Sequence, residues 1–139
     1  MSNASIRFED VSVGDELPGL DVELTPAVIV GGALASRDFT PVHHDKAAAQ
    51  SQGLSDVIMN ILTTNGYVGR FVTDWAGPDA IVKEVSIRLG APNMPGDTMK
   101  MSGTVVSAED GVIEVEVVGK NAWGNHVDGT VSVALVAGD

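Results

Sequence analysis

The densest group of polar side chains lies in residues 37–45, Arg-Asp-Phe-Thr-Pro-Val-His-His-Asp. Within it, Asp38 and His43 combine a carboxylate and an imidazole five positions apart. In a helix, five residues turn through about 140°, which would point these two side chains apart. Pro41 disfavours a continuous helix, so we expect a loop that brings both groups into one pocket. Because histidine titrates near neutral pH and a carboxylate can orient it, the pair suits general acid–base chemistry.

A plainer interpretation of the same residues is also open. Asp38 and Asp45 can be turn and helix-capping residues, and His43 and His44 can be surface groups. A metal site is disfavoured, because His43, His44 and Asp45 are adjacent in the chain and metal ligands are usually spaced to converge on one point. The absence of cysteine excludes disulfides, thiolate zinc sites and cysteine nucleophiles. We therefore expect an acid–base pair or a structural turn here, and no metal.

The length and composition describe an acidic globular domain. The chain has 139 residues, which fits one domain over residues 1–139, and 44% of them are hydrophobic. Its formal net charge is −11 with only 8 Lys and Arg, so it repels nucleic-acid phosphates and anionic membrane surfaces. No run approaches the about 18 apolar residues of a membrane span, and no basic segment precedes an apolar one at the N-terminus. We expect a cytoplasmic protein that binds neither nucleic acid nor membrane.

The segments on either side of the polar cluster are expected to hold it in place. Residues 28–35 before it are apolar, and periodicity does not decide between a buried strand and a short helix. After it, Asp45 is placed to cap a short helix through residues 47–49, and Gly53 is placed to end that helix. The cluster should therefore form the loop between an apolar segment and a helix start.

A longer helix is predicted next. Ser55 or Asp56 would cap it, and it would run to Trp75 before a Gly-Pro pair. Its apolar residues occupy more than one stripe, so most of its surface should be covered. Gly66 and Gly69 lie in its interior, where each costs about 1 kcal/mol relative to alanine. We expect these glycines to allow close packing against another backbone.

From Ala80 onward, apolar and polar residues alternate. The alternation predicts three or four long strands, within residues 81–89, 99–105, 113–117 and 127–136. Glu109-Asp110-Gly111 predicts a hairpin turn, whereas the first 25 residues should be irregular with short strands. One covered helix followed by such a meander indicates an α+β domain whose antiparallel sheet wraps around the helix. The unpaired sheet edge predicts association with a second copy or with a different chain.

The order of these features resembles a known family. Asp-x-x-Pro-x-His at residues 38–43, followed by an alanine-rich helix, resembles the hydratase motif of the MaoC-like (R)-specific enoyl-CoA hydratases. Residues 13–15 resemble that family's first strand, residues 57–75 its central helix, and residues 95–98 the Gly-Asp turn before its long strands. The resemblance covers nearly the whole chain. It implies a hotdog fold, an α+β domain whose antiparallel sheet wraps around a long central helix.

A closer resemblance involves three segments, residues 35–39, 42–45 and 72–78. They are similar to the small subunits of the actinobacterial steroid side-chain enoyl-CoA hydratases. In that family, the small hotdog subunit carries the catalytic Asp and His and pairs with a larger subunit. The resemblance implies an enzyme that adds water to a trans-2-enoyl-CoA in the β-oxidation of the cholesterol side chain. It also implies an α2β2 heteromer and no cofactor, because the CoA thioester is the substrate.

The same resemblance implies the site residues, position by position. Asp38 and His43 would hold a water between them and share the acid and base roles, whose division stays open. Arg37 and Thr40 stand where the family has Gly and Asn, and Met-Asn replaces its His-Gly at the helix start, which favours the steroid-type subgroup. The residues expected to bind the substrate lie near the start of the central helix and on a later strand: Met59, Asn60, Thr63, Thr64 and Arg88.

Other functions stay open at this stage. The chain can be a homodimeric short-chain hydratase or dehydratase, or a thioesterase acting on another acyl carrier. It can also be a non-catalytic hotdog subunit that stabilises a catalytic partner. The joint presence of Asp38 and His43 in one loop favours an enzyme, because acid–base pairs cluster at working sites.

Several single residues have two interpretations. Thr63 and Thr64 can bind substrate or form plain helix surface, because threonine can also bond within its own helix. His126 can be a structural histidine or a functional one. The CoA phosphates require cations, which either a partner or three residues of this chain would supply: Arg88, Lys100 and Lys120.

Overall fold

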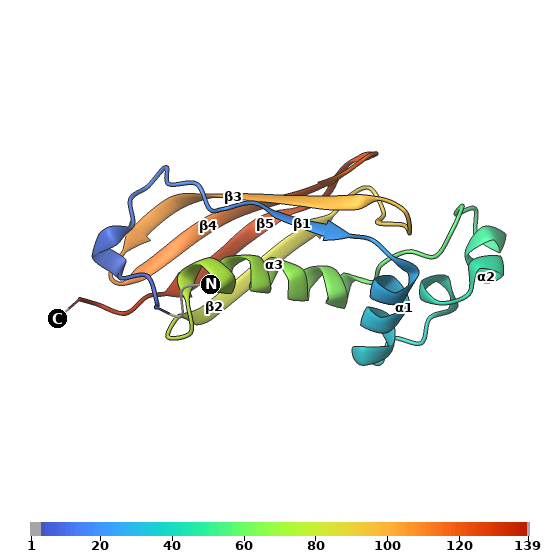
Figure 1. Cartoon of the computed structure of the whole chain (residues 1–139), viewed down its shortest axis with the longest axis horizontal. Coiled ribbons are helices and arrows are strands. Elements are labelled where there is room, and N and C mark those ends of the chain that lie inside the picture. The colour runs from blue at the N-terminus through green and yellow to red at the C-terminus, as the bar shows by residue number, and fades with distance from the viewer. Residues whose placement is uncertain (1–3, 139) are drawn as a thin grey trace.

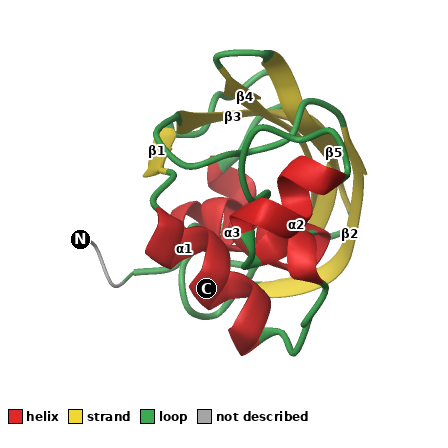
Figure 2. Ribbon diagram, turned by 90° about the vertical axis from the view of Figure 1, so that its right-hand side faces the viewer, coloured by secondary structure: helices red, strands yellow, loops and turns green. Residues whose placement is uncertain are grey.

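A five-stranded antiparallel sheet curls around one long helix in the computed structural model, which describes residues 4–138 (Figure 1). The strands are β1 (Leu20–Glu23), β2 (Ile81–Leu89), β3 (Thr98–Glu109), β4 (Val112–Asn121) and β5 (Gly124–Ala134). Their order across the sheet is β1-β3-β4-β5-β2, so β1 and β2 form its two edges. Seen from the end of the molecule, the sheet bends around the helix α3 (Ile61–Ala76) (Figure 2). The expected α+β arrangement of sheet and central helix is confirmed.

The shorter helices gather beyond the N-terminal end of α3 (Figure 1). They are α1 (Pro26–Ala35), the 3-10 turn η2 (Pro41–His43) and α2 (Lys46–Ser51), whereas the 3-10 turn η1 (Phe8–Asp10) lies at the other end. Residues 26–35 are helical because Pro26 fits the first helical position and the Thr25 hydroxyl accepts a hydrogen bond from the Val28 N–H (3.1 Å). Asp45 caps α2, as the sequence predicts. No helix within residues 4–138 is long and apolar enough to cross a membrane.

Two turns before and after β3 match the sequence prediction. Asp110 and Gly111 both have positive φ (52° and 80°), the geometry of a tight hairpin between β3 and β4. Gly96 also has a positive φ (94°), which an L side chain would adopt only with strain. The Gly96 N–H donates to the carbonyl of Leu24 (2.8 Å), so this turn is tied to the end of β1. These turns fix the register of the long strands.

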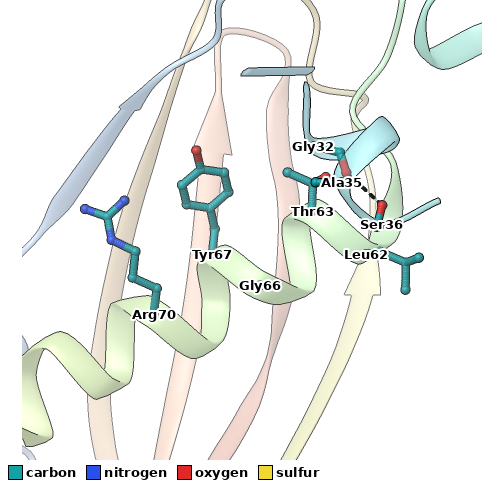
Figure 3. Close-up of a pocket in the computed structure, with 8 residues that line it drawn as sticks. All are labelled: Gly32, Ala35, Ser36, Leu62, Thr63, Gly66, Tyr67 and Arg70. Carbon is teal, nitrogen blue, oxygen red and sulfur yellow. Dashed lines mark hydrogen bonds between the residues drawn. The ribbon is translucent and has the colours of Figure 1, made fainter. Parts of the chain in front are cut away.

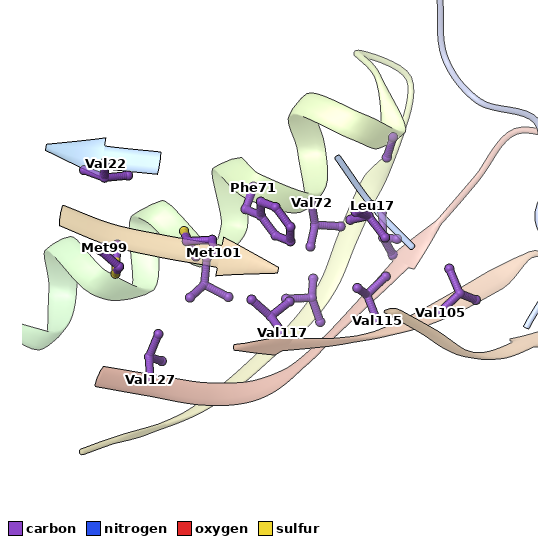
Figure 4. Close-up of a cluster of buried hydrophobic side chains, with 14 of the residues drawn as sticks. Leu17, Val22, Phe71, Val72, Met99, Met101, Val105, Val115, Val117 and Val127 are labelled. Carbon is purple, nitrogen blue, oxygen red and sulfur yellow. The ribbon is translucent and has the colours of Figure 1, made fainter. Parts of the chain in front are cut away.

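The hydrophobic core lies between the sheet and α3 (Figure 4). Alternate residues of β3, β4 and β5 point into it, and Val105, Val115 and Val131 are fully buried. Phe71 of α3 packs over Gly103, where a Cβ atom would lie 2.8 Å from the ring. The edge strand β2 differs, because none of its residues is fully buried in this chain.

The central helix begins later than the sequence predicts. Residues 57–60 are not helical, and Asn60 caps α3 by accepting a hydrogen bond from the Thr63 N–H (3.2 Å). The backbone of this segment is engaged elsewhere: the Ile58 N–H donates to the carbonyl of Val42, and the Met59 N–H donates to the carbonyl of Asn93 (both 3.0 Å). These contacts with residues distant in sequence keep residues 57–60 out of the helix. The predicted cap at Ser55 or Asp56 is therefore wrong.

Two strand predictions are also corrected. Residues 13–15 resemble the family's first strand but form a turn in which Gly14 has a φ of 97°, as the glycines and proline of residues 13–19 predict. The first strand is β1 instead. The last strand begins at Gly124, three residues earlier than expected, because its pairing with β4 continues to Asn121. It ends at Ala134, since the chain beyond it bridges to Arg7 rather than to β4.

The glycines of α3 do not pack against another backbone of this chain. A Cβ atom at Gly66 or Gly69 would meet nothing within 4 Å. The expectation of close packing is therefore wrong within the chain itself. The missing side chains instead leave the outer surface of α3 open.

His126 is a buried structural residue in this fold. Its Nδ1–H donates to the carbonyl of Ala91 (2.7 Å), and the Thr64 hydroxyl donates to its Nε2 (2.8 Å). A carbonyl can only accept, so the proton of the neutral ring lies on Nδ1. Burial lowers the pKa of His126 below its usual value of 6.5, although the bond to Ala91 opposes the shift. The uncharged imidazole thus links β5 both to α3 and to the segment that follows β2.

This burial predicts a loss of stability in mild acid. An unfolded chain binds a proton at His126 near pH 6.5, whereas the folded chain does not until the pH falls further. Unfolding is therefore favoured as the pH falls through that window. His126→Gln should be less stable than the wild type at pH 7.5, but should lose less stability between pH 7.5 and 5.5. Urea unfolding at both pH values measures this, with His44→Gln as a control; equal acid losses in the wild type and His126→Gln would contradict the assignment.

Candidate active site

The loop between α1 and α2 brings Asp38 and His43 together. Arg37 has a positive φ (56°), which turns the chain at the end of α1, and the Asp38 N–H donates to the carbonyl of Ala33 (2.9 Å). Pro41 begins η2, which carries His43 back towards α1. The Nε2 atom of His43 lies 3.3 Å from Oδ2 of Asp38. The loop geometry expected from the sequence is present.

Asp38 is surrounded by hydrogen-bond donors. Its Oδ1 accepts from the hydroxyl (2.8 Å) and the N–H (3.2 Å) of Thr40, and its Oδ2 accepts from Nδ2 of Asn60 (3.2 Å). The Thr40 hydroxyl, followed by its N–H and the Asn60 amide, lowers the pKa of Asp38 below its usual value, whereas burial acts in the opposite direction. Asp38 is therefore a carboxylate at neutral pH.

The orientation of His43 is set by a backbone carbonyl. Its Nδ1 lies 2.7 Å from the carbonyl oxygen of Ile58, which can only accept, so Nδ1 carries a proton. In the neutral ring, Nε2 then has a free lone pair directed at Asp38. Two acceptors 3.3 Å apart leave no room for a water between them, so they need a shared proton or a water that contacts both from the side. The pair is thus arranged to bind a water and to move one of its protons.

The predicted substrate-binding residues at and before the start of α3 fall into two groups, one beside the pair and one away from it. Asn60 lies beside the pair through its bond to Asp38, and the Thr63 hydroxyl bonds to Oδ1 of Asn60. Met59 is buried, and its N–H already donates to the carbonyl of Asn93, so it has no free amide for a substrate. Thr64 is also buried, and its hydroxyl is used by His126. The predictions for Met59 and Thr64 are therefore not supported by their positions.

Arg88 does not contact the pair either. Its side chain is 82% exposed on the edge strand β2, and its guanidinium lies 3.3 Å from the Asp128 carboxylate. Lys100 of β3 and Lys120 of β4 are direct neighbours across the sheet, and both are exposed.

An apolar groove lies beside the pair, between the end of α1 and the outer surface of α3 (Figure 3). Its volume is about 360 Å³, and eight residues line it: Gly32, Ala35, Ser36, Leu62, Thr63, Gly66, Tyr67 and Arg70. Figure 3 shows Thr63, Tyr67 and Arg70 on successive turns of α3. Ser36 and Thr63 both bond to Asn60, which bonds to Asp38, so the groove adjoins the carboxylate. No sequence pattern indicates this groove, because α1 and α3 meet only in the tertiary structure.

Within residues 4–138, no three His, Asp or Glu side chains are placed to hold a metal ion. What the loop presents is one ionised carboxylate, one imidazole whose Nε2 lies 3.3 Å from it, and an apolar groove next to them.

Comparison with known proteins agrees with this arrangement. The family model of the MaoC like domain matches residues 11–137. The chain belongs to the MaoC-like domain family. The resemblance found in the sequence is therefore confirmed, and the sheet and central helix are the MaoC-like hotdog fold. The family match includes Asp38, His43 and the whole of α3.

Three known proteins are similar to this MaoC-like chain. The 3-oxo-4,17-pregnadiene-20-carboxyl-CoA hydratase beta subunit of Mycobacterium tuberculosis is 49% identical over 123 residues, covering 88% of this chain and 95% of that protein. One chain of the ChsH1-ChsH2 complex from the same organism has a TM-score of 0.88 and 48% identity, covering 89% of this chain and 98% of that one. The R-hydratase PhaJ1 from Pseudomonas aeruginosa has a TM-score of 0.87 at 20% identity, covering 96% and 88%, and shows the shared fold alone.

Proposed function

We propose that this chain is the catalytic subunit of a hydratase that adds water to a trans-2-enoyl-CoA whose acyl group derives from a steroid side chain. The observation that carries the proposal is the Asp38–His43 pair, 3.3 Å apart and next to an apolar groove. The 49% identical relative, named as a steroid-type CoA hydratase subunit, supports the substrate class. The reaction belongs to β-oxidation, and we place the protein in the cytoplasm.

The geometry supports a direct mechanism for the addition. A water that contacts both Asp38 and His43 loses a proton to the pair as its oxygen bonds to C3 of the enoyl group. The π electrons of C2=C3 move towards the thioester carbonyl, and a proton is then delivered to C2. The product is a 3-hydroxyacyl-CoA, so the atoms of one water are accounted for. No redox step occurs, and we propose that the enzyme needs no cofactor.

The charge that develops on the thioester oxygen needs a donor. The Met59 N–H is already bonded to Asn93, which leaves the Asn60 N–H at the start of α3 as the donor that we assign. This donor lies on the same residue whose side chain holds Asp38. Carbonyl and water would therefore be oriented from one short segment.

We propose that the working form contains a second hotdog subunit in an α2β2 assembly. Among the described residues, the edge strand β2 has no neighbour on its outer side, and it carries exposed apolar residues, Ile81, Val82 and Leu89. An unpaired apolar edge favours association with another chain. The solved ChsH1-ChsH2 complex is a two-protein assembly that includes a chain 48% identical to this one.

The test of function combines assembly and activity. The chain is purified alone and after co-expression with a neighbouring hotdog protein, and native mass gives the composition. Loss of enoyl-thioester absorbance is then measured with a steroid enoyl-CoA and with crotonyl-CoA. Steroid activity that appears only in the mixed complex supports the proposal. Activity of an isolated homodimer on crotonyl-CoA alone would favour a short-chain hydratase, and inactivity of both forms would favour a non-catalytic subunit.

The groove makes a separate prediction about specificity. Gly66→Leu places a side chain into space that is open in the wild type, without disfavouring the helix. We expect kcat/KM for the steroid enoyl-CoA to fall by about tenfold or more, a usual effect of misfit in an apolar pocket. The value for crotonyl-CoA should change less than about twofold.

Gly69→Leu is the matched control, because Gly69 is equally open but does not line the groove. Both variants are compared as assembled complexes of verified native mass. A fall of the same size for both substrates in Gly66→Leu would show that the groove does not hold the acyl group.

A further inference from the structure

A chain of hydrogen bonds runs from α1 to the candidate carboxylate through Ser36 and Asn60. We propose that Asn60 is a positioning residue that keeps Asp38 a permanent carboxylate, so that Nε2 of His43 carries the proton that moves in the reaction. The inference rests on the proposed hydratase function and divides the acid and base roles, which the sequence left open. It follows from counting donors and acceptors around the pair.

Every polar atom of the Asn60 side chain has a fixed partner. The residue is 1% exposed. Its Nδ2 donates one hydrogen to the Ser36 hydroxyl oxygen (2.9 Å) and the other to Oδ2 of Asp38 (3.2 Å). Its Oδ1 accepts from the N–H and the hydroxyl of Thr63. A flipped amide would place an oxygen against the carboxylate and an NH₂ against a backbone N–H, so this orientation is required.

The network is anchored in both helices that form the groove. The hydroxyl hydrogen of Ser36 donates to the carbonyl of Gly32 (2.7 Å), which leaves its oxygen free to accept from Asn60. The close approach of α1 to α3 requires glycine at position 32, because a Cβ atom there would collide with the Thr63 side chain. Asn60 is thus held by α1 on one side and by the first turn of α3 on the other.

The donors around Asp38 leave no place for a proton except towards His43. Oδ1 faces two hydrogens of Thr40, and Oδ2 faces a hydrogen of Asn60. The other charged and titratable groups of this loop do not bond to Asp38. Among the described residues, Arg37 forms no ion pair, Nε2 of His44 bonds to the carbonyl of Phe39, and Asp45 accepts from the Ala48 N–H.

The proton therefore moves on His43. Its Nδ1–H is occupied by the carbonyl of Ile58, so Nε2 is the atom that takes a proton from water as the C3–O bond forms. The imidazolium that results lies 3.3 Å from the Asp38 carboxylate, which stabilises it. Nε2 then returns the proton to C2, and the pair ends in its starting state. Asp38 acts through charge and orientation rather than by accepting the proton.

The test uses Asn60→Ser, because serine keeps an N-cap acceptor for α3 but cannot reach Asp38 with a donor. In the assembled complex, kcat should fall about tenfold to hundredfold, the range for losing one hydrogen bond to a charged group. KM for the enoyl-CoA should stay within about twofold. The pKa of Asp38 should rise, followed by 13C NMR of the carboxyl carbon in complexes whose 13C-aspartate is confined to this chain. Asn65→Ser on the exposed side of α3 is the matched control and should change none of these.

Ser36→Ala is a second variant that removes only the far partner of the Asn60 amide. It should shift kcat and the Asp38 pKa in the same directions by smaller amounts. An unchanged Asp38 pKa in both variants, with lowered stability alone, would reduce Asn60 to a helix cap and overturn the inference. The Asp38 titration needs no substrate, so a complex that hydrates no enoyl-CoA would defeat the proposed function while leaving the effect of Asn60 measurable.

Discussion

Asp38→Asn in the assembled complex is expected to lower kcat for enoyl-CoA hydration by about a thousandfold, within the range for acid–base groups. Asparagine has the same shape, but it is neutral and cannot stabilise an imidazolium on His43. The NH₂ end of the new amide must also face either the donor of Asn60 or the two donors of Thr40. The loss should therefore exceed the loss of a single hydrogen bond.

His43→Gln is expected to produce a comparable loss for a different reason. Glutamine can donate to a carbonyl such as that of Ile58, but it cannot take a proton from water at neutral pH. Because Asp38 and His43 act on one proton, their losses should not add. The kcat of the double variant should lie within about tenfold of the kcat of the less active single variant. KM should change little in all three, since neither group is assigned to substrate binding.

Initial rates of enoyl-thioester absorbance loss measure these effects, and native mass and thermal unfolding show whether each complex is intact. Asp38 is partly exposed, and its substitution by a residue of the same shape leaves the core unchanged. An intact Asp38→Asn complex that keeps more than about a tenth of the wild-type kcat would sink the acid–base assignment, because such groups contribute at least about a hundredfold.

The chemistry of this site could be predicted from local sequence because its main parts lie within six residues. Asp38, Pro41 and His43 are close in the chain, and proline restricts the loop enough to bring the two side chains together. The cap of α2 by Asp45 is equally local. Patterns of this length depend on the conformational preferences of neighbouring residues, which the rest of the fold changes little.

The start of α3 could not be predicted for the opposite reason. Residues 57–60 are apolar enough to continue a helix, but their amides bond to Val42 and Asn93, which are distant in sequence. The sequence predicts that Asn60 binds the substrate, whereas its side chain is the partner of Asp38, 22 positions away. No local pattern distinguishes an asparagine that caps a helix from one that also holds a carboxylate.

The two threonines of α3 show how a single residue step changes a role. Thr63 and Thr64 are adjacent, so about 100° of helix rotation separates them, and one lines the groove while the other is buried. A signal was available: Thr64 stands four and seven residues before Val68 and Phe71, both buried. That spacing defines the core-facing stripe of the helix and indicates an inward position for Thr64.

Gly129→Ala is expected to lower the free energy of unfolding by about 3 kcal/mol, at the upper end of the usual cost of overpacking. Gly129 of β5 is paired with Ile87 of β2, and a Cβ atom there would collide with the carbonyl oxygen of Ser86 and lie 2.8 Å from the Cα of Ile87. Both are backbone atoms, which cannot rotate away as a side chain would. β2 must then separate from β5.

This separation should also impair assembly, because β2 is the edge assigned to the partner and β5 is its only neighbour in the described sheet. Urea unfolding gives the stability change, and native mass after co-expression gives the assembly. Gly66→Ala is the control: its Cβ meets nothing within 4 Å, and alanine should stabilise α3 by up to about 1 kcal/mol. If Gly129→Ala unfolds within about 0.5 kcal/mol of the wild type, β2 is not held tightly by β5, and the edge that it offers to a partner is less rigid than the register implies.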